Sequence, residues 1–449
     1  MNIFGTDGIR GKVNQWPMTA ELIQKVAISA ASIYFGKGGS NLNRVIIGKD
    51  TRLSGYMLEP ALVAGFTSMG MDCLTLGPIP TPGVSRLTRS FRADLGVMIS
   101  ASHNPSEDNG IKLFGPDGFK LDNQIESEIS ALAKGSISLA KAHELGRARR
   151  MLDSVGRYVE FAKSTLPGRT RLDGLKLVVD CANGAAYRTA PDTLFELGAE
   201  VIPLAVTPDG FNINEDCGAV YPQVMASAVV AHGADAGICL DGDADRLIMA
   251  DENGTIIDGD QILGCLALAM QEKGTLFTNA VVGTVMSNRG LETMLGRADI
   301  DLHRVAVGDR YILEKMRNDG FNLGGEPSGH ILMTDFARSG DGLLTALQML
   351  TLLKGSTKKA SSMFNSFRPN PQRLKNLTGI DPIILQRKPL QAAIREIETG
   401  LGRRGRVLVR PSGTEPLIRV MVEAESEPLL SATMDALILC ITDESDKNA

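Results

Sequence analysis

The 449-residue sequence lacks long hydrophobic runs, contains only 5% aromatic residues and has almost no excess of charge of either sign. Its longest apolar run, Ile262 to Met270, is far shorter than the roughly 20 residues that a membrane-spanning helix needs. The first residues, MNIFGTDGIRG, lack the basic stretch and apolar core of a signal peptide. A formal net charge of −5 is small for this length, which argues against nucleic acid or a membrane surface as a partner. We therefore expect a cytoplasmic globular protein.

Cysteines are few and scattered. The six lie at positions 73, 181, 217, 239, 265 and 440, and no two form a C-x-x-C pair. Several, such as Cys181 and Cys239, stand inside apolar runs that are typical of strands. This pattern favours buried thiols in a reducing compartment over disulfides or a zinc site.

Three segments share one plan, in which strands alternate with helices and a last strand ends in polar residues. They begin at RVIIGKD (44–50), LKLVVDCANG (175–184) and AVVGTVMSNRG (280–290). Their last strands are ADLGVMIS (93–100), ADAGICLD (234–241) and FNLGGEPS (321–328). The repeat predicts three related α/β layers with mainly parallel sheets. Because ligands gather beyond the carboxyl ends of strands in such sheets, it also predicts one shared cleft.

The pattern changes after about Pro369. A helix, two strands and a last helix are expected at LQAAIREIETGLG, RVLVRPSG, LIRVMVEAE and LLSATMDALILCI. This α+β unit predicts a separate fourth domain. We place the four domains at residues 1–153, 154–253, 254–368 and 369–449.

Three alternating aspartates, Asp241, Asp243 and Asp245, end the second repeat in LDGDADRLIMADENG. One alternative is a solvated turn. Another is a calcium loop, with Glu252 at its twelfth position, but Arg246 stands where that loop has glycine. Carboxylates this close repel one another by about 4 kcal/mol per pair at 4 Å and an effective dielectric near 20. We therefore predict a Mg²⁺ site that leaves room for a phosphate.

The first repeat ends in MISASHNP (98–105). Asn104 and Pro105 alone indicate only a turn that ends a strand. No G-x-S-x-G elbow surrounds Ser102, and adjacent side chains such as Ser102 and His103 rarely face each other, so a hydrolase triad is not indicated. The equivalence of this loop with the aspartate loop predicts instead that Ser102 carries a phosphoryl group, whose charge of about −1.5 to −2 the metal balances.

The third repeat ends in GGEPSGH (324–330). Its first two glycines allow the backbone to approach a ligand, while Glu326, Ser328 and His330 offer an acceptor, a hydroxyl and a titratable ring. A plain glycine loop with a surface carboxylate is the alternative. We predict that this loop binds a polyhydroxylated ligand.

The fourth unit contains VRPSGTEPLIRV (409–420). A hairpin turn explains its glycine and proline but not both arginines. Guanidinium groups, hydroxyls and converging N–H groups together favour a phosphate-binding loop formed by Arg410, Ser412, Gly413, Thr414 and Arg419. Two other cations, Arg10 in FGTDGIRG and Lys112 in NGIKLFGPDG, are weaker candidates for the same cleft.

Five motifs, FGTDGIRG, SASHNP, DGDADR, GEPSGH and RPSGTEP, resemble in this order the α-D-phosphohexomutase superfamily over essentially the whole chain. FGTDGIRG and the proline of GEPSGH resemble the bacterial branch that acts on glucosamine phosphates. The resemblance implies four domains around a central cleft, the first three with related mixed α/β cores and the fourth α+β. It implies interconversion of glucosamine 6-phosphate and glucosamine 1-phosphate through a 1,6-bisphosphate, with glucosamine or glucose 1,6-bisphosphate as the priming activator.

The resemblance also implies a role for each motif residue. Ser102 is the phosphoserine, and Asp241, Asp243 and Asp245 bind Mg²⁺ together with its phosphate. Glu326 and Ser328 bind the sugar hydroxyls. The substrate's non-reacting phosphate is bound by Arg410, Ser412, Gly413, Thr414 and Arg419. Four further residues stabilise charge or transfer protons, namely Arg10, Lys112, Arg246 and His330. Arg246 also belongs to the substrate-binding residues.

The expected partner is a small sugar phosphate, without nucleic acid or membrane, and a homodimer is compatible with the sequence. A phosphomannomutase or phosphoglucomutase of the same superfamily is the nearest alternative function. A metal-dependent sugar phosphatase is a second alternative, since the D-x-D pattern alone permits it. A catalytically inactive sugar-phosphate sensor is disfavoured because every motif position is intact.

Overall fold

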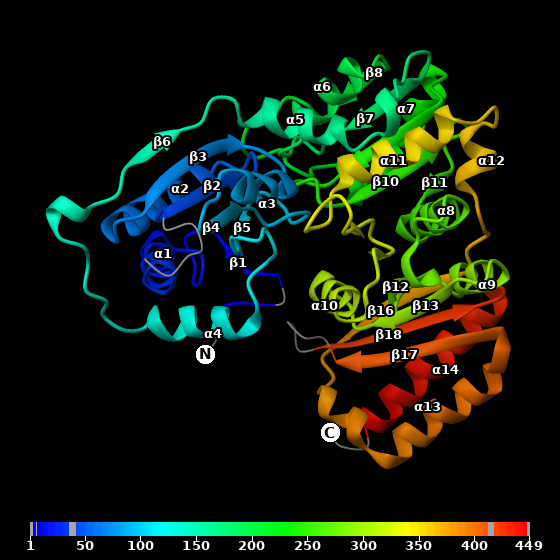
Figure 1. Cartoon of the computed structure of the whole chain (residues 1–449). Coiled ribbons are helices and arrows are strands. Elements are labelled where there is room, and N and C mark those ends of the chain that lie inside the picture. The colour runs from blue at the N-terminus through cyan, green and yellow to red at the C-terminus, as the bar shows by residue number, and fades with distance from the viewer. Residues whose placement is uncertain (1–2, 6, 36–41, 412–416, 447–449) are drawn as a thin grey trace. The chain divides into compact units, whose positions relative to one another are not determined.

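The computed structural model describes residues 3–5, 7–35, 42–411 and 417–446. The chain divides into two compact units, one formed by residues 1–287 and 295–366, the other by residues 288–294 and 367–449. Within the described residues, three sheets belong to the first unit and one to the second (Figure 1).

The first sheet has the strand order β1-β5-β4-β2-β3-β6. Its strands are β1 (Ile9–Lys12), β2 (Arg44–Lys49), β3 (Asp72–Pro78), β4 (Leu95–Ile99), β5 (Asp108–Phe114) and β6 (Ala148–Arg150). Its helices are α1 (Ala20–Tyr34), α2 (Gly55–Ser68), α3 (Thr81–Ser90) and α4 (Asn123–Leu132). Strand β4 is buried along its whole length, as an apolar strand covered on both faces should be. Helix α1 packs against α2 and α4 (Figure 1).

The second sheet has the order β11-β10-β9-β7-β8. Its strands are β7 (Lys176–Asp180), β8 (Glu200–Leu204), β9 (Ala236–Leu240), β10 (Leu247–Asp251) and β11 (Ile256–Ile257). Its helices are α5 (Ser154–Ser164), α6 (Thr189–Glu196) and α7 (Pro222–His232). Strands β9 and β10 are fully buried and pair antiparallel, so the loop between them, residues 241–246, is a tight connection.

The third sheet has the order β13-β12-β14-β15. Its strands are β12 (Ala280–Thr284), β13 (Asp301–Val305), β14 (Leu323–Gly325) and β15 (Ile331–Met333). The helices of this region are α8 (Gly259–Glu272), α10 (Asp309–Asp319), α11 (Gly342–Lys354) and α12 (Ala360–Phe364). Helix α9 (Arg289–Arg297) is divided, since residues 288–294 belong to the second unit. Helix α11 begins at Asp341, whose carboxylate accepts from the backbone N–H of Leu344 and so caps the helix.

The three sheets repeat one topology. The strand orders β5-β4-β2-β3, β10-β9-β7-β8 and β15-β14-β12-β13 are equivalent, with three strands parallel and one antiparallel in each. The predicted repeat is therefore confirmed, and each sheet is mixed because a strand returns directly after the polar loop. Those loops follow β4, β9 and β14, the equivalent strands of the three repeats.

The second unit contains a sheet of order β16-β18-β17, antiparallel throughout. Its elements are β16 (Gln372–Thr378), β17 (Gly405–Pro411), β18 (Leu417–Ala424), α13 (Lys388–Leu401) and α14 (Glu427–Asp446). Only four of these elements were expected from the sequence. Strand β16 was missed because six of its seven residues are exposed, which leaves no hydrophobic alternation to detect.

Short 3₁₀ turns complete the described elements. They are η1 (Ala142–Glu144), η2 (Pro167–Arg169), η3 (Gly218–Val220), η4 (Phe277–Asn279), η5 (Pro382–Gln386) and η6 (Gly402–Arg404). The predicted domain boundaries at 153/154, 253/254 and 368/369 stay a prediction.

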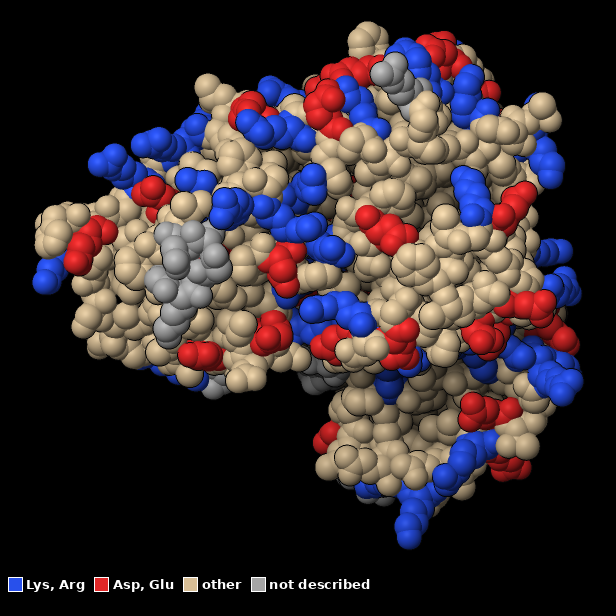
Figure 2. All heavy atoms as spheres, in the orientation of Figure 1, with Lys and Arg blue, Asp and Glu red and all other residues tan. Residues whose placement is uncertain are grey.

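The burial of the cysteines agrees with the sequence-based expectation. The cysteines are unpaired, and all are buried except Cys440, which is half-buried. Among the described helices, none combines the length and hydropathy required to cross a membrane. Basic and acidic side chains are intermixed over the face drawn in Figure 2.

Candidate active site

Three loops that follow equivalent strands bring the predicted site residues together. Ser102 follows β4, Asp241 follows β9 and Glu326 follows β14, and their relative exposures are only 1%, 0% and 9%. The serine hydroxyl donates to Asp241 Oδ2 at 2.6 Å, and the imidazole Nδ1 of His330 lies 3.6 Å from Asp245 Oδ1. The three loops therefore meet, as the repeat predicted.

Ser102 is held in an unusual backbone conformation. Its φ of +52° lies in the left-handed region, where a residue other than glycine is strained by about 1–3 kcal/mol. Its N–H donates to Ser100 Oγ at 2.9 Å. Contrary to the sequence-based expectation that neighbouring side chains rarely face each other, His103 Nδ1 lies 3.3 Å from Ser102 Oγ. Burial, followed by the charges of Arg246 and Arg10, lowers the pKa of His103 to about 3, so its ring is neutral.

The three aspartates form a compact carboxylate group. Asp241, Asp243 and Asp245 are buried, and one oxygen of each lies within 4.8 Å of the others. Burial, followed by the charges of Asp245 and Asp243, raises the pKa of Asp241 to about 7. Within the described residues, the Oδ1 atoms of Asp243 and Asp245 are buried without a hydrogen-bond partner. Asp245 Oδ1 faces the His330 ring at 3.6 Å, so Asp243 Oδ1 is the oxygen with no nearby donor among the described residues. Such a hard oxygen atom within a group of three buried carboxylates fits a small divalent cation such as Mg²⁺.

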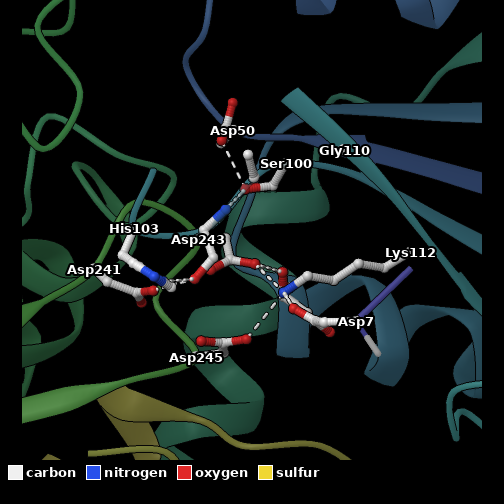
Figure 3. Close-up of polar contacts among 12 residues, drawn as sticks. Asp7, Asp50, Ser100, His103, Gly110, Lys112, Asp241, Asp243 and Asp245 are labelled. Atoms are coloured by element: carbon white, nitrogen blue, oxygen red, sulfur yellow. Dashed lines mark hydrogen bonds and ion pairs between the residues drawn. The ribbon is translucent and has the colours of Figure 1, made fainter. Parts of the chain in front are cut away.

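Lys112 and Thr81 hold this carboxylate group in place. The Lys112 ammonium lies 2.8 Å from Asp243 Oδ2, 3.1 Å from Asp245 Oδ2 and 3.5 Å from Asp7 Oδ2 (Figure 3). Burial alone lowers the pKa of Lys112, but Asp243, Asp245 and Asp7 raise it well above its ordinary value, so the charge persists. Thr81, at the first turn of α3, donates its hydroxyl to Asp243 Oδ2 at 2.5 Å and its N–H to Asp243 O at 3.0 Å.

Two predicted arginines lie beside these loops. Arg10 pairs with Asp7 and donates to Ala101 O and Asn104 Oδ1, each at 3.4 Å. It therefore contacts the serine loop, residues 100–107 between β4 and β5. The backbone N–H of Arg246 donates to Asp241 Oδ1 at 3.2 Å. Burial lowers the pKa of the Arg246 guanidinium, but Asp241, Asp245 and Glu326 raise it above its ordinary value.

The third loop presents the predicted acceptor, hydroxyl and ring. Glu326 Oε1 accepts from the Gly308 N–H at 2.9 Å, and its Oε2 accepts from the Ser328 hydroxyl at 3.2 Å. Burial lowers the pKa of His330, but the carboxylates of Asp245 and Asp309 raise it to about 9, so the ring is charged at neutral pH. Gly340 packs against that ring, since a Cβ atom at position 340 would lie 2.5 Å from it.

Sequence reasoning missed a set of charged residues around this site. Lys120 pairs with both Asp7 and Asp309, and His330 Nε2 lies 3.8 Å from Asp309 Oδ2. Arg310, next in α10, pairs with Glu126 of α4 at 2.7 Å. Asp7 and His103 lie inside two of the quoted motifs, FGTDGIRG and SASHNP, but were assigned no role. Thr81, Lys120 and Asp309 have no local signal that distinguishes them from ordinary polar surface residues.

In the second unit, Arg410 and Arg419 lie directly opposite each other in the β17–β18 ladder. Opposite residues of an antiparallel pair share a face, where like charges repel. Burial and the charge of Arg419 lower the pKa of Arg410. An anion bound on this face would offset the repulsion. The predicted Ser412, Gly413 and Thr414 lie outside the described residues.

Four family models match the chain in order. The models for phosphoglucomutase/phosphomannomutase alpha/beta/alpha domains I, II and III match residues 1–138, 156–254 and 258–370, and that for the C-terminal domain matches residues 372–439. The predicted architecture, three related mixed α/β domains and a fourth α+β domain, is confirmed by these matches and the four sheets.

The chain also resembles relatives and solved structures whose names belong to this group of sugar-phosphate mutases. The phosphoglucosamine mutases of Paracoccus denitrificans and Roseobacter denitrificans are 56% and 55% identical, each over 98% of both chains. A phosphoglucomutase/phosphomannomutase family protein from Burkholderia thailandensis matches the fold with a TM-score of 0.83 at 24% identity, over 99% of this chain and 97% of that one. Aspergillus fumigatus N-acetylphosphoglucosamine mutase, in complex with GlcNAc-6P and magnesium, has a TM-score of 0.68 at 18% identity, over 98% of this chain and 96% of that one.

Proposed function

The chain belongs to the phosphoglucomutase/phosphomannomutase family of α-D-phosphohexomutases, and we propose that it interconverts glucosamine 6-phosphate and glucosamine 1-phosphate. The observation that carries the mechanism is the 2.6 Å hydrogen bond between the Ser102 hydroxyl and Asp241, a member of the buried carboxylate group. The choice of amino sugar rests on the relatives that are 55–56% identical.

Ser102 is the residue that gives and receives the phosphoryl group. A hydroxyl oxygen of the substrate attacks phosphorus, and the bond from phosphorus to Ser102 Oγ breaks. The hydroxyl proton passes to a base of the site, and an acid of the site gives a proton to the leaving Ser102 oxygen. The product of this half-reaction is the sugar 1,6-bisphosphate and free Ser102. After the bisphosphate turns end for end, its other phosphoryl group returns to Ser102, which loses its proton. Glucosamine or glucose 1,6-bisphosphate primes an unphosphorylated enzyme by the same transfer.

The cations of the site neutralise the phosphoryl charge and position the reacting groups, which is most of what phosphoryl transfer requires. Lys112 is buried against Asp243 and Asp245 and keeps both carboxylates oriented. Arg10 contacts the serine loop, and the charged His330 ring faces Asp245. Arg246 lies among Asp241, Asp245 and Glu326, where a guanidinium is available to an anionic substrate.

Mg²⁺ would be held by Asp241, Asp243 and Asp245 together with the phosphate on Ser102. When bound, it supplies charge that stabilises the transferring phosphoryl group. The closeness of the three buried carboxylates and the unpartnered Oδ1 atom of Asp243 support this assignment.

Sugar and phosphate are bound by separate loops in this proposal. Glu326 and Ser328 bind the sugar hydroxyls, and the opposed pair of Arg410 and Arg419, with Ser412, Gly413 and Thr414, binds the non-reacting phosphate. We further infer a cytoplasmic enzyme of four domains, at 1–153, 154–253, 254–368 and 369–449, whose partner is a small sugar phosphate.

The test is an assay of glucosamine 1-phosphate formation with and without a catalytic amount of glucose 1,6-bisphosphate. The glucosamine, mannose and glucose phosphates are compared side by side, because a site built for an amine rejects a hydroxyl that leaves its buried partners unpaired. Preference for mannose or glucose phosphates would assign the chain to another branch of the family. Stoichiometric release of inorganic phosphate would favour the phosphatase alternative.

A further inference from the structure

The guanidinium of Arg52, in the loop between β2 and α2, is buried beneath the serine loop with a relative exposure of 1%. Its Nε donates to Asp50 Oδ2 at 2.8 Å. Among the described residues, its two terminal nitrogens donate to backbone carbonyls of the serine loop and of Asp108, the first residue of β5. These are Ser102 O at 2.9 Å, Asn104 O at 2.8 Å, Asp108 O at 3.0 Å and Pro105 O. One rigid, always charged group therefore binds four carbonyls around the reacting serine.

Asn214, from the segment between β8 and η3, binds two of the same carbonyls. Its Nδ2 donates to Ser102 O at 3.0 Å and to Asn104 O at 3.1 Å, and the side chain is buried. Gly242, between two of the carboxylates, leaves the space for this contact, because a Cβ atom there would lie 2.5 Å from Ser102 O and 2.9 Å from Asn214 Nδ2. The aspartate loop thus packs directly on the carbonyl of the serine.

The amide side of Ser102 is held as well. Asp50 Oδ2 accepts from the Ser100 hydroxyl at 2.7 Å (Figure 3). Ser100 Oγ in turn accepts from the Ser102 N–H at 2.9 Å. The carbonyl of Ser102 is therefore bound by side chains from two other segments, and its N–H is bound by Ser100, whose hydroxyl is held by Asp50. None of these contacts involves the serine hydroxyl, so they are independent of whether Ser102 carries phosphate.

We infer that Arg52 and Asn214 are positioning residues that keep Ser102 in its left-handed conformation, aimed at Asp241, while its phosphoryl group leaves and returns. The inference rests on the proposed mutase function. In that reaction the serine donates a phosphoryl group once and accepts one once. If the serine loop relaxed after the first transfer, Ser102 would no longer be positioned to accept the second. Side chains that bind the loop through its carbonyls prevent this without contacting the substrate.

Asn214→Gly tests the inference with little strain, because glycine readily adopts the φ of +59° at this position. The matched control is Asn279→Gly, which replaces an exposed asparagine at φ +49°. A second variant, Arg52→Lys, keeps a positive charge beside Asp50 but lacks the fork needed to bind four carbonyls. For each protein, kcat, KM, the melting temperature and the rate of Ser102 phosphorylation by glucose 1,6-bisphosphate, followed by intact mass, are measured.

We expect Asn214→Gly to lower kcat and the phosphorylation rate about tenfold with KM changed less than about twofold, and Arg52→Lys to lower them about 100-fold. Asn279→Gly should match the wild type. Wild-type kcat and phosphorylation rate in folded Asn214→Gly or folded Arg52→Lys would overturn the inference, as would a loss confined to the melting temperature. If Arg52→Lys does not fold, Asn214→Gly decides alone. A wild-type enzyme inactive on every hexose phosphate would instead refute the proposed function.

Discussion

Ser102 and Asp241 are 139 positions apart in the chain, yet the hydroxyl of one donates to a carboxylate oxygen of the other at 2.6 Å. Each residue lies in the loop that follows the corresponding strand of its own repeat, β4 and β9. The internal repeat therefore brings the proposed phosphoserine and a candidate metal ligand together from equivalent loops of two sheets.

Ser102→Ala should abolish turnover, and added glucosamine 1,6-bisphosphate should not restore it, because no oxygen remains to carry phosphate. Wild-type enzyme stripped of phosphate provides the control and should regain activity with the same bisphosphate. Peptide mapping of the active protein should find phosphate on Ser102 and not on Ser100 or Ser106. Full activity without any phosphoserine would contradict the mechanism.

Asp243→Asn should bind substrate but turn over about 100-fold more slowly, because losing a buried carboxylate weakens the metal site while the sugar and phosphate loops are unchanged. Asparagine keeps an acceptor for the Thr81 hydroxyl, so the fold should survive. Activity and Mg²⁺ affinity are measured over a range of Mg²⁺ concentrations. Near wild-type activity at the wild-type Mg²⁺ requirement would show that Asp243 is not a ligand.

Arg410→Ala should raise KM at least tenfold, with a smaller effect on kcat, because a phosphate bound equally in ground and transition states contributes uniform binding. It also removes the repulsion with Arg419 across the ladder, so the melting temperature should not fall. Inorganic phosphate should inhibit the variant less than the wild type. Loss of Ser102 phosphorylation, measured by intact mass, would place Arg410 in the chemical step instead.

Asp341→Asn should raise the free energy of unfolding at pH 8 by about 1–3 kcal/mol. Burial raises the pKa of Asp341 from 3.8 to about 6, although bonds from the Leu344 N–H and the Tyr158 hydroxyl lower it and Asp245 adds repulsion. The folded state thus keeps a proton that the unfolded state loses, and the stability this confers below about pH 4 is lost as the pH rises through 6. Asparagine preserves the helix cap without the buried charge.

Thermal or denaturant unfolding at pH 5 and pH 8 checks this prediction. The gain should be larger at pH 8, since at pH 5 the wild-type carboxyl still holds most of its proton. A variant less stable than the wild type at pH 8 would show that ionisation of Asp341 does not lower the free energy of unfolding.

Several features of the molecule were predictable because they depend on residues close together in the chain. The three polar loops follow apolar strands of similar sequence, so the repeat and the meeting of the loops followed from local pattern alone. The alternation of Asp241, Asp243 and Asp245 also indicated a metal site, because three carboxylates in one tight loop repel without a cation. Strand β16 was not predicted, because its exposed side chains show no hydrophobic alternation.

The type of fold and the chemistry of each loop could therefore be predicted from local sequence. The pairing of the charged groups could not, because it depends on how distant segments pack. Lys120 reaches Asp7 and Asp309 across 113 and 189 positions, and Arg52 reaches the carbonyls of Ser102 and Asn104 across 50 and 52. A buried charge is stable only beside an opposite charge or a hydrogen-bonding group. Local periodicity carries no information about which distant segment supplies that partner.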